Sequence, residues 1–200
     1  MIPTRNRVHS IFYMMDVYVI DYDDCILPTT VLQQHNTSQQ PRWSTLIAAL
    51  LRTFNSLICC GRVVIVTNGA RAWVEMTCKQ HLPDVWAFIV QQDIAVFSGR
   101  DAYETIYPTD SIRWKFESFR TLFESIPNIS TFISIGDSDA ERVAAQRICD
   151  REKCVCKTIK LKHEPSVEEL ILQWERLFDL VLDVLIEYDG SIDVHINPLV

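Results

Sequence analysis

Three carboxylates stand close together after a short apolar segment near the N-terminus. Residues 17–20 form a β-prone apolar run, and Asp21, Asp23 and Asp24 follow it directly. Like charges at this spacing repel one another unless a cation or a hydrogen-bond network offsets them. A hard cation that prefers oxygen ligands, such as Mg²⁺, would do so. The alternative interpretation is a plain acidic turn after a strand, since aspartate is common in turns.

Small polar residues also follow three later segments that are candidates for buried strands: residues 62–66, 94–97 and 131–135. Thr67 and Asp137 lie just beyond the first and the last of these segments. In an open parallel sheet, ligands bind beyond the carboxyl ends of the strands, near the switch in strand order. Three loops that are far apart in the sequence would therefore bring Asp21, Thr67 and Asp137 to one crevice.

Helix candidates alternate with these strand candidates. Apolar residues recur at helical spacing in four segments, residues 43–58, 70–82, 111–125 and 140–149, and a fifth short strand is expected at residues 157–161. Strands that alternate with helices pair in parallel. We therefore predict an α/β protein with a three-layer Rossmann-like fold, in which helices cover both faces of a central parallel sheet of about five strands.

The length and composition fit one domain over residues 1–200. Of these residues 48% are hydrophobic, which is ample for a sizeable core. Residues 1–10 form a polar leader that we expect to be flexible, and residues 32–40 have the composition of a loop. The sequence contains no internal repeat or interdomain linker.

A long apolar helix is predicted near the C-terminus, over residues 166–188. Ser166 with Glu169 three positions later is the signature of a capping box. The apolar residues that follow cover more than one narrow stripe of the helix. We expect the helix either to pack on the core or to form the interface of a homodimer.

The charge balance excludes a broad basic surface. The formal net charge is −7 and the isoelectric point is near 5.2, which argues against binding nucleic acid or an anionic membrane through a basic face. The apolar run over residues 11–20 is interrupted by Asp16, unlike a signal peptide or a membrane span. A soluble, cytoplasmic protein is expected.

The seven cysteines do not suggest a zinc site or a cysteine nucleophile. Their spacing matches no paired CxxC framework, so reduced thiols are expected. No cysteine is followed by arginine at the sixth position, as a phosphate-binding Cys-x5-Arg loop would require.

The residues at the strand ends resemble the haloacid dehalogenase-like superfamily, in its phosphatase branch. Asp21-Tyr22-Asp23-Asp24-Cys25 is similar to the Asp-x-Asp-x-Thr motif of that family, although Cys25 replaces the usual Thr. Thr67 and Lys115 stand where the second and third motifs would be, and residues 136–141 (Gly-Asp-Ser-Asp-Ala-Glu) resemble the acidic fourth motif. The resemblance covers roughly residues 17–161, and its first and fourth motifs are the specific ones.

The resemblance implies a phosphohydrolase that works through an aspartyl-phosphate. Asp21 would be the nucleophile, and Asp23 would be the general acid and base. Mg²⁺ would be held by the Asp21 carboxylate, the backbone carbonyl of Asp23 and Asp137. The phosphoryl group would be bound by Thr67, Asn68 and Lys115.

Several assignments have alternatives. Lys115 could be an ordinary surface lysine, with Arg100 and Arg113 as competing cations. Either Asp139 or Glu141 could reach the metal shell, and Glu141 fits the family spacing better. Three other expectations concern residues outside the site. Asp24 is expected either to be solvated or to lie behind the metal ligands. Residues 98–101 are expected to form a surface turn, and His163 is expected to lie on the surface.

Three functions compete at this level. The first is a Mg²⁺-dependent phosphatase. The second is an enzyme of the same fold with another activity, such as a dehalogenase, a phosphotransferase or a small-metabolite phosphatase. The third is a non-catalytic or regulatory binding protein. Asp23 disfavours the dehalogenase, which lacks the second aspartate in this family. The intervals at residues 26–61 and 68–114 leave no room for a cap domain. A capless site is linked in the family to larger phosphorylated substrates, including phosphoproteins.

Overall fold

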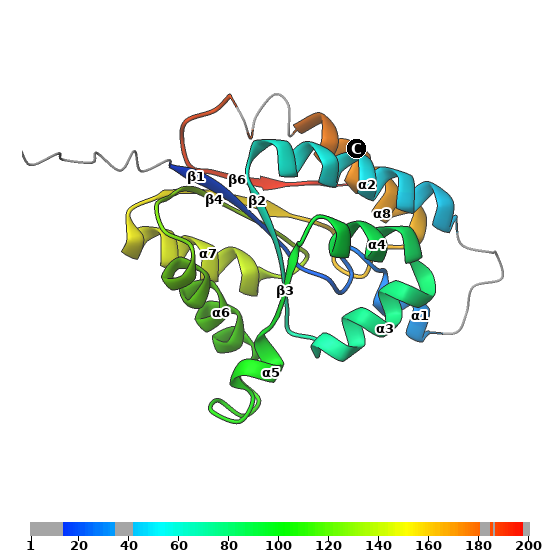
Figure 1. Cartoon of the computed structure of the whole chain (residues 1–200), viewed down its shortest axis with the longest axis horizontal. Coiled ribbons are helices and arrows are strands. Elements are labelled where there is room, and N and C mark those ends of the chain that lie inside the picture. Colours follow the sequence, from blue (N-terminus) through cyan, green and yellow to red (C-terminus); the bar gives the residue numbers. More distant parts are fainter. Residues whose placement is uncertain (1–13, 35–41, 181–184, 186, 198–200) are drawn as a thin grey trace, which may run out of the picture.

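The computed structural model describes residues 14–34, 42–180, 185 and 187–197. The predicted leader at residues 1–10 and most of the predicted loop at residues 32–40 lie outside this part of the chain. The described residues form one sheet of parallel strands with helices on both faces (Figure 1). The predicted three-layer Rossmann-like fold is therefore confirmed.

The sheet has six strands in the order β3-β2-β1-β4-β5-β6. They are β1 (Met15–Ile20), β2 (Arg62–Thr67), β3 (Ala95–Ser98), β4 (Ile129–Gly136), β5 (Val155–Lys160) and β6 (Ile192–His195). All neighbouring pairs are parallel. The strand order reverses at β1, which lies between β2 and β4, so the predicted crevice falls at the switch point between β1 and β4.

The described helices are α1 (Thr29–Gln33), α2 (Trp43–Cys60), α3 (Arg71–His81), α4 (Pro83–Gln91), α5 (Gly99–Tyr103), α6 (Ser111–Ser125), α7 (Asp139–Glu152) and α8 (Val167–Leu180). In Figure 1, α2, α4 and α8 cover one face of the sheet, and α6 and α7 cover the other. Successive side chains of a strand point to opposite faces. Accordingly, Tyr18 and Ile20 of β1 belong to the core cluster under α2 and α8, and Val17 and Val19 to the cluster under α6 and α7.

Three element predictions need correction. Residues 29–33 form α1, so the predicted loop begins later than residue 32. The turn expected at residues 98–101 is the start of α5, where the Ser98 hydroxyl accepts a hydrogen bond from the Asp101 amide. The C-terminal helix does not extend to residue 188, because Glu187 lies in a turn and Tyr188 lies outside any helix, while residues 181–184 and 186 are outside the described part.

Helix α8 packs on the core of its own chain. The Trp174 side chain is fully buried, and its ring meets Phe54 of α2 edge-on with 5.5 Å between the ring centroids. Trp174 Nε1 also donates a 2.7 Å hydrogen bond to the carbonyl of Cys25. The C-terminal helix thus packs on the core and contacts the acidic loop (residues 21–28) directly; a homodimer stays a prediction.

Removing this hydrogen bond should destabilise the protein. Trp174→Phe keeps an aromatic ring but leaves the buried Cys25 carbonyl without this donor. We expect the free energy of unfolding to fall by about 1–3 kcal/mol in urea denaturation, because an unpaired buried acceptor costs that much. Trp86→Phe on α4, which makes the same change at a half-buried indole elsewhere in the chain, is the control. Equal stability of the Trp174→Phe protein and the parent would contradict the anchoring role.

By length and composition, α2 is the one helix among the described residues that could cross a membrane. Core helices of soluble proteins pass the same test. The inner face of α2, which includes Leu46, Leu50, Phe54 and Leu57, is fully buried against the rest of the chain. This burial is what a core-packing helix requires, and cytoplasmic localisation stays a prediction.

Candidate active site

The strand register brings the predicted site residues to one level. Ile20 of β1 is paired with Ile65 of β2 on one side and Ile135 of β4 on the other. Asp21, Thr67 and Asp137 therefore emerge one or two residues beyond the same row of the sheet. A cavity of about 580 Å³ opens there, and its lining includes Asp21, Asp23, Thr67, Asn68 and Asp137.

Asp21 is held at one carboxylate oxygen only. The Lys115 ammonium lies 3.0 Å from Asp21 Oδ1, and the amide of Tyr22 donates to the same oxygen at 2.8 Å. Within the described part of the chain, no donor contacts Oδ2. The residue is 8% exposed, and burial raises the pKa of Asp21, an effect that Lys115 opposes. Both of these contacts thus fix Oδ1, and neither involves Oδ2.

Lys115 is a fully buried cation and not a surface lysine. Its Nζ lies 3.0 Å from Asp21 Oδ1, 3.1 Å from Glu141 Oε1 and 2.8 Å from the carbonyl oxygen of Val66. These three acceptors match the three N–H groups of an ammonium. Burial alone would lower the pKa of Lys115, but the two carboxylates outweigh burial and raise it. The side chain stays charged, and it links the ends of β1, β2 and α7.

Glu141, and not Asp139, reaches the site from the start of α7. Glu141 is 4% exposed, and besides Lys115 it bonds the amide and hydroxyl of Ser138 in a capping box. Burial opposes ionisation of Glu141, but Lys115 and Ser138 outweigh it and lower its pKa. The Asp139 side chain is 69% exposed and pairs with Arg142. A Cβ at position 136 would lie 2.7 Å from Glu141 Cγ, so glycine is required there.

Asp137 is contacted at both carboxylate oxygens. The Cys25 thiol donates to Oδ1 at 3.7 Å, and His163 Nδ1 lies 2.7 Å from Oδ2. Burial raises the pKa of Asp137 despite the opposing hydrogen bond to His163, and that bond raises the pKa of His163. His163 lies on the surface, as expected, but its exposed imidazole also lines the cavity and contacts Asp137 from the loop after β5.

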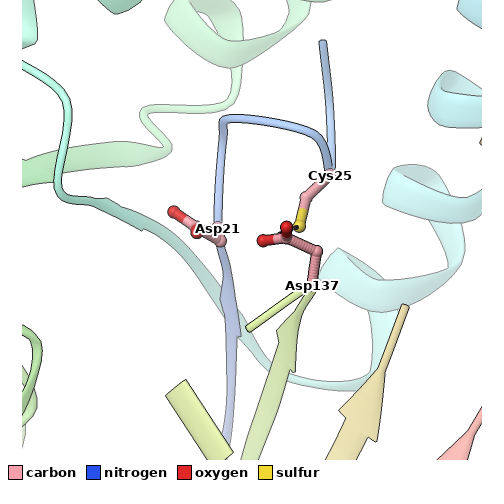
Figure 2. Close-up of side chains that lie close together, drawn as sticks. All are labelled: Asp21, Cys25 and Asp137. Atoms are coloured by element: carbon pink, nitrogen blue, oxygen red, sulfur yellow. Dashed lines mark hydrogen bonds between the residues drawn. The ribbon is translucent and has the colours of Figure 1, made fainter. Parts of the chain in front are cut away.

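Asp21 and Cys25 of the acidic loop lie close to Asp137 at the end of β4; in Figure 2 the Cys25 thiol faces the Asp137 carboxylate, while the Asp21 carboxylate points away from both. One potential ligand atom from each residue lies within 4.8 Å of the others. Burial and the nearby Asp137 raise the pKa of the Cys25 thiol, so it remains protonated and is a poor ligand for a hard cation. The donors suited to Mg²⁺ are therefore the carboxylates of Asp21 and Asp137.

The negative charge of this region exceeds the positive charge that the chain supplies. Five carboxylates line the cavity, those of Asp21, Asp23, Asp24, Asp137 and Glu141, against the buried ammonium of Lys115 and the exposed guanidinium of Arg100. A divalent cation between Asp21 and Asp137 would offset their mutual repulsion; the charge of Asp137 contributes, after burial and Glu141, to the raised pKa of Asp21. The carboxylate oxygens of Asp21 and Asp137 are thus ligands of the kind that suits Mg²⁺.

Asp23 and the end of β2 form the other wall. Asp23 Oδ2 accepts a hydrogen bond from the Thr67 hydroxyl at 3.3 Å, and Oδ1 accepts one from Trp73 Nε1 at 3.0 Å. Thr67 Oγ1 in turn accepts from the amide of Gly69 at 2.8 Å. Asn68 donates from its side chain to the carbonyl of Ser111 at 2.9 Å, while its buried Oδ1 has no hydrogen-bond partner among the residues that the structure describes.

Asp24 is a buried residue that bonds to the start of α1. It is 5% exposed, and its φ of 54° lies in the left-handed region that aspartate tolerates better than most residues. Its carboxylate accepts hydrogen bonds from the Thr30 amide at 3.0 Å and from the hydroxyls of Thr29 and Thr30. Asp24 therefore fixes the start of α1 and is not solvated.

No family model, curated protein or solved structure matches the chain. The resemblance to the haloacid dehalogenase-like superfamily thus rests on the sequence motifs. The geometry of the site rests on the structure alone.

Proposed function

We propose that the protein is a Mg²⁺-dependent phosphohydrolase that works through an aspartyl-phosphate on Asp21. The observation that most strongly supports this proposal is the arrangement around Asp21. Oδ1 is fixed by the buried Lys115, and Oδ2 has no contacting donor among the described residues. A carboxylate held in this way is oriented to attack with its open oxygen.

The side chains around Asp21 suit the two steps of such a reaction. Asp21 Oδ2 attacks the phosphorus atom, and the bond from phosphorus to the leaving oxygen breaks while Asp23 protonates that oxygen. Asp23 then takes a proton from a water molecule, which attacks the acyl phosphate and releases phosphate together with the free Asp21 carboxylate. The Lys115 charge offsets the negative charge that gathers on the phosphoryl oxygens.

The binding residues complete the proposal. Thr67 and Asn68 lie at the cavity wall, where a hydroxyl and backbone amides would contact the phosphoryl group. Asp21, the backbone carbonyl of Asp23 and Asp137 would hold Mg²⁺. When bound, the ion would supply positive charge against the phosphoryl oxygens.

Metal removal tests this function directly. The purified protein should hydrolyse an aryl phosphate in Mg²⁺, lose that activity in a chelator and regain it when Mg²⁺ is added in excess. The physical reason is that the carboxylates of Asp21 and Asp137 repel both each other and the anionic substrate until a cation offsets them. Activity that persists in the chelator, or no activity on any phosphate ester, would contradict the proposal.

The walls of the cavity suggest a substrate larger than a simple metabolite. Its lining includes the exposed residues Gln33, Arg100 and His163, so the cavity opens to solvent. The described residues of the intervals 26–61 and 68–114 form strand β3 of the sheet, helices α1 to α5 and the start of α6 (Figure 1). We propose a phosphorylated macromolecule, such as a phosphoprotein, as the substrate class.

An open site predicts weak binding of small substrates. With little means of excluding water or enclosing a small ligand, KM for simple phosphate esters should be on the order of millimolar or above. Steady-state kinetics on a panel of sugar phosphates, nucleotides and phosphopeptides measures this. A micromolar KM for a sugar phosphate or nucleotide, with no turnover of phosphopeptides, would argue for a small-metabolite phosphatase instead.

A further inference from the structure

The Asp23 carboxylate is held from two separate elements. Trp73 Nε1, on the first turn of α3, donates to Oδ1 at 3.0 Å, and the hydroxyl of Thr67, at the end of β2, donates to Oδ2 at 3.3 Å. Asp23 itself is only half-buried, so neighbouring atoms do not confine it on every side. These two hydrogen bonds therefore fix the direction of the carboxylate.

Gly69 shows how closely this group is packed. A Cβ at that position would lie 2.9 Å from Asp23 Oδ2, 3.2 Å from Trp73 Cδ1 and 3.3 Å from Thr67 Oγ1. Contacts below 3.4 Å are tighter than ordinary van der Waals contacts, so a side chain at position 69 would displace the carboxylate, the indole or the hydroxyl. The carboxylate, the indole and the hydroxyl thus occupy the space that a side chain at position 69 would need.

Helix α3 is bonded to the acidic loop at a second point, one helical turn beyond Trp73. The Thr77 hydroxyl donates to the Trp73 carbonyl at 2.7 Å and also meets the Tyr22 hydroxyl at 2.8 Å. Tyr22 is fully buried. Two consecutive loop residues, Tyr22 and Asp23, are thus tied to the same face of α3, and the Trp73 indole is held on a rigid element.

We propose that Trp73 is a positioning residue that aims the Asp23 carboxylate at the leaving oxygen of the substrate. This inference rests on the proposed phosphohydrolase function. An indole N–H can only donate, so Trp73 holds Asp23 Oδ1 as an acceptor. Oδ2, whose partner Thr67 has a hydroxyl that rotates, is then the oxygen that exchanges the proton. Trp73 lines the same cavity as Asp21 and Asp23, close to where a leaving group would lie.

The proposal predicts a loss that depends on the leaving group. A well-placed general acid matters most when the leaving oxygen is strongly basic, as in an alkyl phosphate, and little for a nitrophenyl phosphate. Trp73→Phe keeps the ring and removes the N–H. We expect kcat/KM for the alkyl phosphate to fall about tenfold or more, and for the nitrophenyl phosphate to change less than about threefold.

The experiment compares four full-length proteins on both substrates in Mg²⁺: the parent, Trp73→Phe, Asp23→Asn and the control Trp86→Phe. Trp86 is also half-buried but lies on α4, outside the cavity. Asp23→Asn should show the same selectivity as Trp73→Phe with a larger loss, and Trp86→Phe should match the parent. A fifth protein, Gly69→Ala, keeps the indole N–H but crowds the Asp23 carboxylate, the indole and the Thr67 hydroxyl. It should reproduce the selective loss, and it replaces Trp73→Phe should that variant not fold.

Equal losses on both substrates, or no loss on either, would overturn the positioning role while leaving the proposed function intact. A parent protein that hydrolyses neither substrate would overturn the proposed function and this inference with it. Circular dichroism of each variant separates these outcomes from simple unfolding.

Discussion

Replacing Asp21 by Asn is expected to lower kcat on an aryl phosphate by more than about 10³-fold, because an amide cannot form the acyl phosphate. The fold should survive, since the amide oxygen can still accept from Lys115 and the Tyr22 amide in place of Oδ1. Steady-state rates, with thermal melting of the same samples, measure both effects.

Asp139→Asn is the matched control for this variant. Asp139 is an exposed carboxylate two residues beyond Asp137, and its partners are on the surface. The control should keep the activity of the parent. An Asp21→Asn protein that is as active as this control would show that Asp21 is not the nucleophile.

Lys115→Met should have the largest effect on stability. The substitution leaves the carboxylates of Asp21 and Glu141 buried without their shared cation. Removing one partner of a buried ion pair costs about 3–5 kcal/mol, so the free energy of unfolding should fall by that amount in urea. Activity should be lost as well, because the phosphoryl oxygens lose a positive charge.

A second substitution separates the two consequences of Lys115→Met. Adding Glu141→Gln removes one of the two unpaired charges, so the double variant should regain about 1–2 kcal/mol relative to Lys115→Met alone. It should not regain activity, because Asp21 still lacks its cation. Lys79→Met, which breaks an exposed pair with Glu75, should change stability by less than about 1 kcal/mol. A double variant less stable than Lys115→Met would contradict the shared-cation account.

The sequence predicts the parallel core of the sheet well because the buried strands are short, apolar and followed by polar residues. It does not reveal β6, whose four residues, Ile192–His195, are alternately half-buried and exposed at the edge of the sheet. It also misses α4. Pro83 occupies the first turn of that helix, a position that proline favours, but only one residue separates α4 from α3.

Whether a residue of the site can be predicted from the sequence depends on the element that carries it. Asp21, Thr67 and Asp137 follow strand ends, and the geometry of a parallel sheet is enough to bring them together. The position of Lys115 followed only from the family resemblance, because helical spacing does not show which end of α6 meets the crevice. The burial of Lys115 and its contacts with Asp21 and Glu141 come from the structure.

Trp73 and His163 reach the site without a sequence signal of their own. Trp73 approaches from the first turn of α3, and His163 from the loop after β5. Neither has the spacing of a catalytic or metal-binding motif, and their contacts with Asp23 and Asp137 span 50 and 26 residues. Only the tertiary structure brings such pairs together.

Trapping the phosphoenzyme tests the central claim most directly. The Asp23→Asn protein is incubated with nitrophenyl phosphate and Mg²⁺, quenched and reduced with borohydride, which converts an aspartyl-phosphate to homoserine. Peptide mass spectrometry then locates the modified residue. We predict homoserine at position 21 and none in a protein that also carries Asp21→Asn. Homoserine at another aspartate, or phosphate on a serine, histidine or cysteine, would contradict the account.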